Sequence, residues 1–224
     1  MGPPNSVRRV VIAIAALAVI GSLASCARPD FQYASEQPGT APAGKVYFKV
    51  PSGWTQLSAA AITKAESAWT TDSTAKNLLQ ATAWQSAFDA APAPSLEHVL
   101  GIDTPEQPTV YASLRQLYAE EKTSINDAAL RDMVVPVSTL GSSVEILSDA
   151  KVSQGSAHGV HLVFSYDPGS GRASQVVDQT TLVSGGDDAV YLLLVRCSTD
   201  CYAKYRAEIT SVTSSYTIQE GRNG

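Results

Sequence analysis

The segment at residues 191–195, Tyr-Leu-Leu-Leu-Val, constrains the fold of this chain more than any other, because it is apolar on both of its alternating faces. Successive side chains of a strand point to opposite sides of a sheet. A strand that is apolar on both sides therefore needs cover on both faces of its sheet. We expect residues 190–197 to form a central strand with a layer packed on each face.

Further segments have the short apolar runs or the polar–apolar alternation of strands. They are residues 45–50, 110–114, 144–146, 160–166 and 176–183. Turn-forming residues at 168–171 (Pro-Gly-Ser-Gly) and 185–188 (Gly-Gly-Asp-Asp) separate strands of the C-terminal half. This half of the chain is predicted to be a meander of antiparallel strands.

Residues 58–91 have helical spacing and are predicted to form two helices. Ser58 is placed to cap the first helix, and residues 71–72 offer a cap for the second. In the second helix, Trp84 and Phe88 would share one face. The two prolines at 92–94 end this helical region.

Two more helices are expected. Ser124 and Asp127 offer an acidic variant of the capping box for a helix near residues 126–133. A final helix begins near Asp200 and carries an apolar stripe at steps of three and four. The stripe consists of Tyr202, Tyr205, Ile209, Val212 and Tyr216. Separate strands and helices of this kind predict an α+β fold, with an antiparallel β-sheet sandwiched by helices.

The first 26 residues have the parts of a bacterial export signal. Arg8 and Arg9 precede an apolar run at residues 10–20, and small residues then lead to Cys26. The run is shorter than the ~20 apolar residues that a transmembrane helix needs. The arginine pair hints at twin-arginine export but lacks the rest of that pattern, so the choice between this route and the general secretory route stays open.

Residues 23–26, Leu-Ala-Ser-Cys, resemble the lipobox of bacterial lipoproteins, in which the cysteine sulfur receives a diacylglycerol before cleavage. Two acyl chains hold a protein stably on a membrane, whereas one chain holds it weakly. We therefore expect residues 1–25 to be a lipoprotein signal peptide and Cys26 to be the lipidated residue. An ordinary secretory signal and a retained short membrane helix are the alternatives.

The mature chain is expected to have three parts. Residues 26–44 contain the lipidated cysteine and a flexible tether rich in Pro, Gly, Ala and Ser, which would hold the body off the bilayer. Residues 45–219 are long enough for one domain with a substantial core. Residues 220–224 are predicted to be a disordered tail.

The two remaining cysteines, Cys197 and Cys201, form an even pair in an oxidising compartment, which favours a disulfide. A redox site usually has Cys-x-x-Cys, and the spacing here is one residue longer. A zinc site would need two more Cys or His residues, and none lies nearby in the sequence.

The net charge of −5 makes nucleic acid an unsuitable partner, because phosphate binding needs a basic patch. Removal of the signal peptide takes away Arg8 and Arg9 and makes the chain more acidic. We expect the membrane contact to be made by the lipid on Cys26. We predict no cofactor and no metal.

Catalytic motifs are weak in this sequence. Residues 39–45 fit Gly-x4-Gly-Lys, but Val46 follows where a phosphate loop has Ser or Thr, and the segment leads into a predicted strand rather than a helix. The sequence contains no Gly-x-Ser-x-Gly motif. Catalytic triads of other kinds are built from residues far apart in the chain, so the sequence alone does not exclude them.

Three histidines could act as bases or metal ligands: His98, His158 and His161. His158 and His161 are three residues apart, so a strand would place them on opposite faces, whereas a turn at residues 155–159 would let them converge near Asp167. We interpret all three as surface or edge-strand histidines. The acidic pairs at 120–121 and 187–188 are interpreted as solvated charges.

Two parts of the chain resemble one family. The strand that ends in Val-Pro-Ser-Gly-Trp at residues 50–54, and the final strand-and-helix unit at residues 190–218, are similar to PsbP-like domains. The whole chain resembles lipoproteins of high-GC Gram-positive bacteria that carry such a domain, including the LpqN type. The resemblance implies an antiparallel sheet between helix layers and no catalytic residues.

The expected function is therefore that of a non-enzymatic binding or accessory protein, lipid-anchored on the extracytoplasmic face of the cell membrane, with an envelope protein or an apolar ligand as its partner. A carrier or sensor of an apolar envelope molecule is the first alternative, and it would need an enclosed apolar cavity. An envelope hydrolase is the second, and it would need a nucleophile and a base that converge in a cleft.

Overall fold

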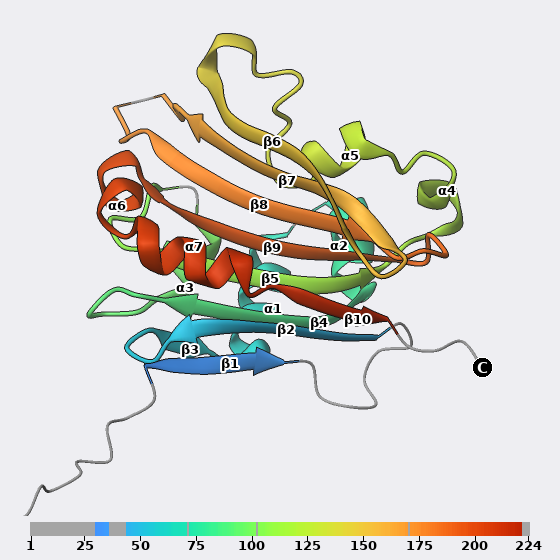
Figure 1. Cartoon of the computed structure of the whole chain (residues 1–224), viewed down its shortest axis with the longest axis horizontal. Coiled ribbons are helices and arrows are strands. Elements are labelled where there is room, and N and C mark those ends of the chain that lie inside the picture. Colours follow the sequence, from blue (N-terminus) through green and yellow to red (C-terminus); the bar gives the residue numbers. More distant parts are fainter. Residues whose placement is uncertain (1–29, 36–43, 71, 102, 170, 221–224) are drawn as a thin grey trace, which may run out of the picture.

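The computed structural model describes residues 30–35, 44–70, 72–101, 103–169 and 171–220. The predicted signal peptide, the lipidation site Cys26 and residues 221–224 of the predicted tail lie outside the described residues. The described chain forms two antiparallel sheets with helices packed around them (Figure 1).

The larger sheet has seven strands in the order β3-β4-β5-β9-β8-β7-β6, and every neighbouring pair is antiparallel. The strands are β3 (Thr55–Leu57), β4 (Thr82–Asp89), β5 (Thr109–Gln116), β6 (Val144–Gln154), β7 (Ala157–Tyr166), β8 (Gln175–Val183) and β9 (Ala189–Ser198). β9 lies in the middle, and all of its residues except Arg196 are buried. The prediction of a central strand covered on both faces is confirmed.

A second, three-stranded sheet covers one face of the larger one. It consists of β1 (Phe31–Ser35), β2 (Gly44–Pro51) and β10 (Thr217–Glu220), in the order β1-β2-β10. Phe48 of β2 points inward, and its ring lies 5.9 Å from that of Phe88 in β4, edge to face. The α+β fold is confirmed, but the cover on this face is a sheet together with helices rather than helices alone.

Helices cover both sides of the larger sheet. They are α1 (Ala59–Trp69), α2 (Ser73–Gln80), α3 (Leu96–Leu100), α4 (Ala119–Lys122), α5 (Asp127–Arg131), α6 (Thr199–Lys204) and α7 (Arg206–Ser214), with a 3₁₀ turn η1 (Gly141–Ser143). α1 and α3 pack on the face opposite the small sheet, whereas α6 and α7 share the face that the small sheet covers (Figure 1). None of the described helices is long and apolar enough to cross a membrane.

The second predicted helix of residues 58–91 is partly wrong, because residues 82–89 form strand β4. Phe88 enters the core between the two sheets, while its neighbour Ala87 packs under α1 on the other face, which is the alternation of a strand. The first helix begins as predicted, since the Ser58 hydroxyl accepts a hydrogen bond from the Ala61 amide at 3.2 Å.

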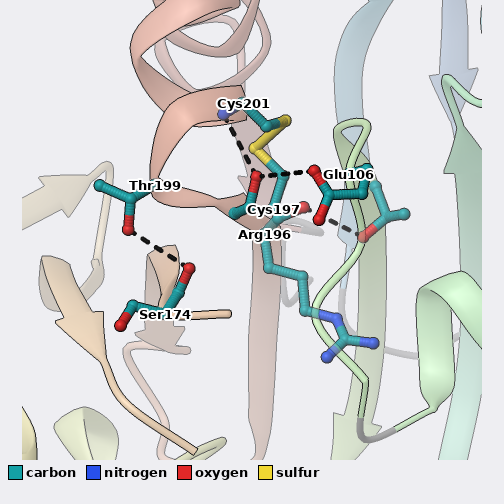
Figure 2. The surroundings of a disulfide bond; sticks show 8 residues. Glu106, Ser174, Arg196, Cys197, Thr199 and Cys201 are labelled. Atoms are coloured by element: carbon teal, nitrogen blue, oxygen red, sulfur yellow. Dashed lines mark hydrogen bonds between the residues drawn. A yellow bond between two sulfur atoms is a disulfide. The ribbon is translucent and has the colours of Figure 1, made fainter. Parts of the chain in front are cut away.

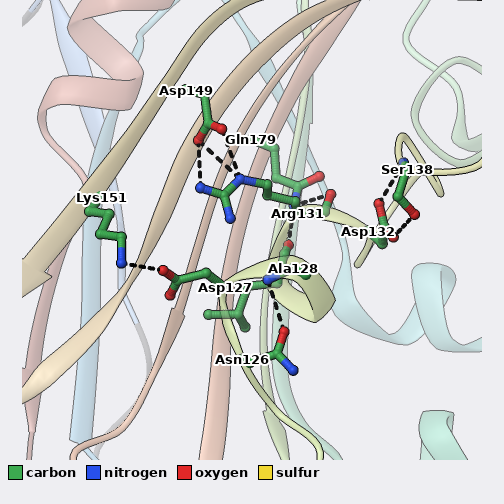
Figure 3. A network of polar contacts seen from close by, with 10 residues as sticks. Asn126, Asp127, Ala128, Arg131, Asp132, Ser138, Asp149, Lys151 and Gln179 are labelled. Atoms are coloured by element: carbon green, nitrogen blue, oxygen red, sulfur yellow. Dashed lines mark hydrogen bonds and ion pairs between the residues drawn. The ribbon is translucent and has the colours of Figure 1, made fainter. Parts of the chain in front are cut away.

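Helix α5 is capped by a different residue from the one predicted. The Asn126 side chain accepts hydrogen bonds from the amides of Ala128 and Ala129, so no Ser124–Asp127 capping box is needed. Figure 3 shows how ion pairs hold this short helix over β6. The Arg131 guanidinium donates hydrogen bonds to both carboxylate oxygens of Asp149 at 2.9–3.1 Å, and Lys151 forms an ion pair with Asp127 at 2.7 Å.

The predicted final helix is divided at Tyr205, where the backbone leaves helical geometry between α6 and α7. Ile209 and Val212 of the predicted stripe are fully buried. Tyr202 and Tyr205 are only half-buried, and Tyr216 is buried just beyond the end of α7. Ile209, Val212 and Tyr216 therefore belong to the core, and the two half-buried tyrosines pack against it.

Strand β1 corrects the predicted start of the folded body. It falls inside residues 26–44, which the composition assigned to the tether, and it pairs with β2 in the register Phe31↔Pro51 to Ser35↔Tyr47. The Gln32 amide donates to the carbonyl oxygens of Pro51 and Trp54, and Ala34 is buried. At the other end, β10 extends to Glu220, the first residue of the predicted tail.

A disulfide joins Cys197, near the end of β9, to Cys201 in α6, with the two Cα atoms 5.8 Å apart (Figure 2). Both cysteines are buried. Ser198 lies between them and caps α6 by accepting a hydrogen bond from the Cys201 amide at 3.3 Å. The bond therefore fixes the turn from the central strand into the helix that covers it.

We expect reduction of this disulfide to lower the free energy of unfolding by about 2 kcal/mol, because the closed loop is very short and restricts the unfolded chain only modestly. Urea unfolding with and without a reductant measures the loss. The Cys197→Ser/Cys201→Ser variant should not respond to the reductant. Two alkylatable thiols in the unreduced, denatured protein would contradict the assignment.

Candidate functional site

A cleft of about 670 Å³ lies between helices α1 and α2, the first half of β4 and the end of β1. It extends along β4 to β3 and to the end of β1, and it opens to solvent. Its lining residues are Ser35, Gln56, Leu57, Ser58, Ala59, Thr63, Glu66, Leu79, Thr82, Ala83, Trp84, Gln85 and Ser86. Most of these side chains are polar, so the cleft differs from the enclosed apolar cavity of a typical lipid carrier.

A hydrogen-bonded network forms the floor of this cleft. The Tyr111 hydroxyl of β5 lies 3.2 Å from Glu66 Oε1 of α1 and 3.0 Å from Gln85 Oε1 of β4. Gln85 Nε2 in turn donates to the Thr63 hydroxyl at 2.8 Å. The network joins three elements and holds the Glu66 carboxyl group at the cleft wall.

The surroundings of Glu66 change its proton affinity. Burial raises the pKa of its carboxyl group, while hydrogen bonds from Tyr111 and Gln85 oppose part of that rise. Burial, together with the charge of Glu66, raises the pKa of Tyr111, so its phenol stays a donor. A partly desolvated carboxyl group of this kind gains more from a donor or cation on a ligand than a fully solvated one does.

Sequence reasoning did not single out Glu66, Gln85 or Tyr111. A signal was available for Glu66, because it follows the buried Ile62 by four residues and therefore lies on the core-facing side of α1. Nothing in the sequence pairs it with Tyr111, which is 45 residues away.

The three histidines are not brought together. His98 lies 2.8 Å from Asp89, whose buried carboxylate also accepts from the amides of Ala91 and Ser95 and so closes the loop after β4. His158 and His161 both belong to β7, where their spacing places them on opposite faces. The described part of the chain contains no group of three or more His, Cys, Asp or Glu residues suited to hold a metal ion.

His161 is not an edge-strand histidine, because β7 lies between β6 and β8. Its Nε2 lies 2.8 Å from the buried carboxylate of Asp178 in β8, which also accepts from the Tyr202 hydroxyl at 2.9 Å. This hydrogen bond raises the pKa of His161, and burial opposes part of the rise. In the described residues neither ring nitrogen of His161 is hydrogen-bonded to a serine, threonine or cysteine.

The raised pKa of His161 predicts a pH-dependent stability. The imidazolium–Asp178 pair contributes fully below about pH 6.5, the ordinary value in the unfolded chain, and its contribution is lost as pH rises through the folded pKa. We therefore expect His161→Gln to destabilise the protein more at about pH 6 than at about pH 8.5. Urea midpoints at both values test this, with the exposed His158→Gln as control; an equal loss at both values would contradict it.

The acidic pairs are only partly solvated. Glu120 and Asp188 are exposed, and Asp188 is paired with Lys122. Glu121 is half-buried and accepts hydrogen bonds from Arg115 at 2.7 Å and from the Tyr118 amide at 2.9 Å. These contacts outweigh the effect of burial and lower the pKa of Glu121. Its role is to hold α4 against the end of β5.

These features define the class of the protein as α+β, with antiparallel sheets flanked by helices and one polar cleft under α1. No protein-family model matches the sequence, and no curated protein matches it significantly. Among solved structures, the chain is similar to LpqN of Mycobacterium tuberculosis, described as involved in cell envelope biogenesis. The identity is 18%, the match covers 85% of this chain and 92% of LpqN, and the TM-score is 0.50.

Two other structures align over similar lengths. The cyanobacterial PsbP of Synechocystis sp. PCC 6803 has 10% identity, covers 89% of this chain and 98% of that protein, and has a TM-score of 0.49. The Ran-binding protein Mog1p of Saccharomyces cerevisiae has 10% identity, with 84% and 95% covered, and a TM-score of 0.45. At 18% identity, the likeness to LpqN concerns the fold alone.

Proposed function

We propose that the protein is a lipid-anchored accessory protein of the bacterial cell envelope that binds a ligand or partner on the extracytoplasmic side rather than catalysing a reaction. The lipobox-like residues 23–26 support the anchor. The fold shared with LpqN supports a role at the envelope. The observation that carries the binding role is the cleft beneath α1.

The chemistry of the cleft favours a ligand with both polar and apolar parts. Trp84 and Leu57 offer apolar contact, while the Glu66 carboxyl group and its hydrogen-bonded neighbours offer acceptors and donors. A ligand without polar groups would leave these side chains desolvated and unpaired, which is unfavourable. An amphiphilic molecule of the envelope therefore fits better than the purely apolar one considered from the sequence.

A large side chain placed in the cleft is expected to prevent ligand binding without unfolding the protein. Ala59 lines the cleft at the exposed start of α1, so Ala59→Trp would occupy the space with little change to the core. Native mass spectrometry of protein purified from its own membranes should detect a non-covalent mass that falls at least about tenfold in this variant.

Ala68→Trp is the matched control, since Ala68 is exposed on the same helix and does not line the cleft. The control should keep the bound mass. Equal occupancy in the two variants, or protein that never carries a bound molecule, would count against ligand binding in the cleft.

A further inference from the structure

The outer face of the small sheet is unusually aromatic and basic for an acidic protein. We define this face by Phe31, Tyr33, Lys45, Tyr47 and Lys49. These residues alternate with the buried ones of β1 and β2, so they point away from the core. Tyr33 is 76% exposed and Tyr47 is 36% exposed. Isolated exposed aromatic residues are common, but here they gather on one surface.

The strand pairing brings the rings and the ammonium groups together. Tyr33 lies directly opposite Lys49, whose Nζ is 4.5 Å from the centre of the Phe31 ring. Tyr47 lies between Ser35 of β1 and Thr217 of β10. The outward-pointing residues of these three described strands include two lysines and no aspartate or glutamate, although the exposed Asp30 directly precedes β1. The outer face of these strands is thus positive while the chain as a whole carries −5.

The proposed anchor is close to this surface in the sequence. Cys26 precedes Phe31 by five residues, which span at most ~18 Å when fully extended. The sequence-based tether of residues 27–44 would have allowed the body to stand well clear of the bilayer. Because β1 begins at Phe31, the small sheet must instead remain within a short reach of the lipid.

We propose that the outer face of the small sheet docks on the bilayer surface, with its aromatic rings at the level of the headgroups and its lysines near anionic lipids. Tyrosine favours this interface because its ring is amphipathic. Lysines next to an anionic leaflet each add roughly fivefold to binding. The inference rests on the proposed lipid anchor, which brings this face to the membrane.

Docking in this orientation determines where the cleft lies. α1 packs on the opposite face of the larger sheet from the small sheet (Figure 1). The cleft runs from α1 and α2 to Ser35 at the end of β1, so it would open at the flank of the molecule beside the docked face, where envelope molecules can reach it.

Lysine acetylation tests the orientation on the native lipidated chain. The protein is bound to vesicles of phosphatidylcholine and phosphatidylglycerol in a ratio of about two to one, and its modification rates are compared with those of the unlipidated Cys26→Ser chain in solution. We expect Lys45 and Lys49 to react at least about fivefold more slowly on the vesicles. Lys64 and Lys76, which are exposed on α1 and α2, should keep their rates.

Charge reversal provides the second measurement. In the Cys26→Ser background, Lys45→Glu/Lys49→Glu should weaken binding to the same vesicles at least about tenfold, whereas the matched Lys64→Glu/Lys76→Glu variant should bind like the parent. If all four lysines showed the same ratio of vesicle rate to solution rate, the docking proposal would be overturned while the anchor stayed intact. Loss of lipidated protein from the vesicles would instead refute the anchor.

Discussion

Cys26→Ala is expected to move the protein from the membrane fraction to the soluble fraction after a wash in about 1 M salt. Without the thiol no diacylglycerol can be attached, and each buried CH₂ of the acyl chains contributes about 0.8 kcal/mol to membrane binding. The apolar run at residues 10–20 is too short to replace the lipid as a membrane-spanning anchor. High salt is needed because it screens the contact that Lys45 and Lys49 are proposed to make.

Ser25→Ala is the matched control, since it keeps a small residue before the cysteine and should leave the protein on the membrane. Fractionation followed by immunoblotting reports the distribution of each variant, and intact mass spectrometry reports the added lipid. If Cys26→Ala stayed in the membrane pellet after the salt wash, lipidation would not be the anchor.

Phe48→Ala should lower the free energy of unfolding by about 3–5 kcal/mol, the usual cost of removing a large buried aromatic side chain. Phe48 is 1% exposed, and its ring touches Phe88 of the larger sheet and Tyr216 beside the small sheet. The substitution would leave a cavity at the junction of the two sheets. Urea unfolding followed by circular dichroism measures the loss.

Tyr47→Ala provides a direct comparison, because Tyr47 directly precedes Phe48 in β2 and points to solvent. Its loss should cost less than about 1 kcal/mol. Similar losses for the two variants would mean that the small sheet does not pack through the face assigned here.

Strands β7, β8 and β9 of the C-terminal meander could be predicted because apolar residues recur in them between turn-forming segments. Strand β6 was predicted only at residues 144–146 and extends to Gln154, because its exposed and mostly polar second half has no apolar pattern. Strand β4 was misjudged for a specific reason. Trp84 and Phe88 are four residues apart, and residues with this spacing share a face in a strand as well as in a helix. The pattern therefore could not separate the two structures, and pairing with β5 decided the outcome.

The sequence analysis did not predict strand β1 or the cleft, because both are formed by contacts between residues that are far apart in the sequence. β1 is short and lies in a segment of low hydrophobicity, and it is held by pairing with β2 and by the hydrogen bonds of Gln32. The cleft network joins Glu66, Gln85 and Tyr111 only after α1, β4 and β5 have packed. Local composition and periodicity contain neither kind of information.

The edge position of β1 also decides how the molecule would respond to a mechanical load. β1 pairs with no strand but β2, so tension applied to the chain before residue 31 would enter the fold through that pairing and the hydrogen bonds of Gln32. The strand would peel away before the larger sheet bore any of the force. A pull on the proposed anchor would thus lengthen the connection to the membrane by several residues, while the central strand and the disulfide kept their structure.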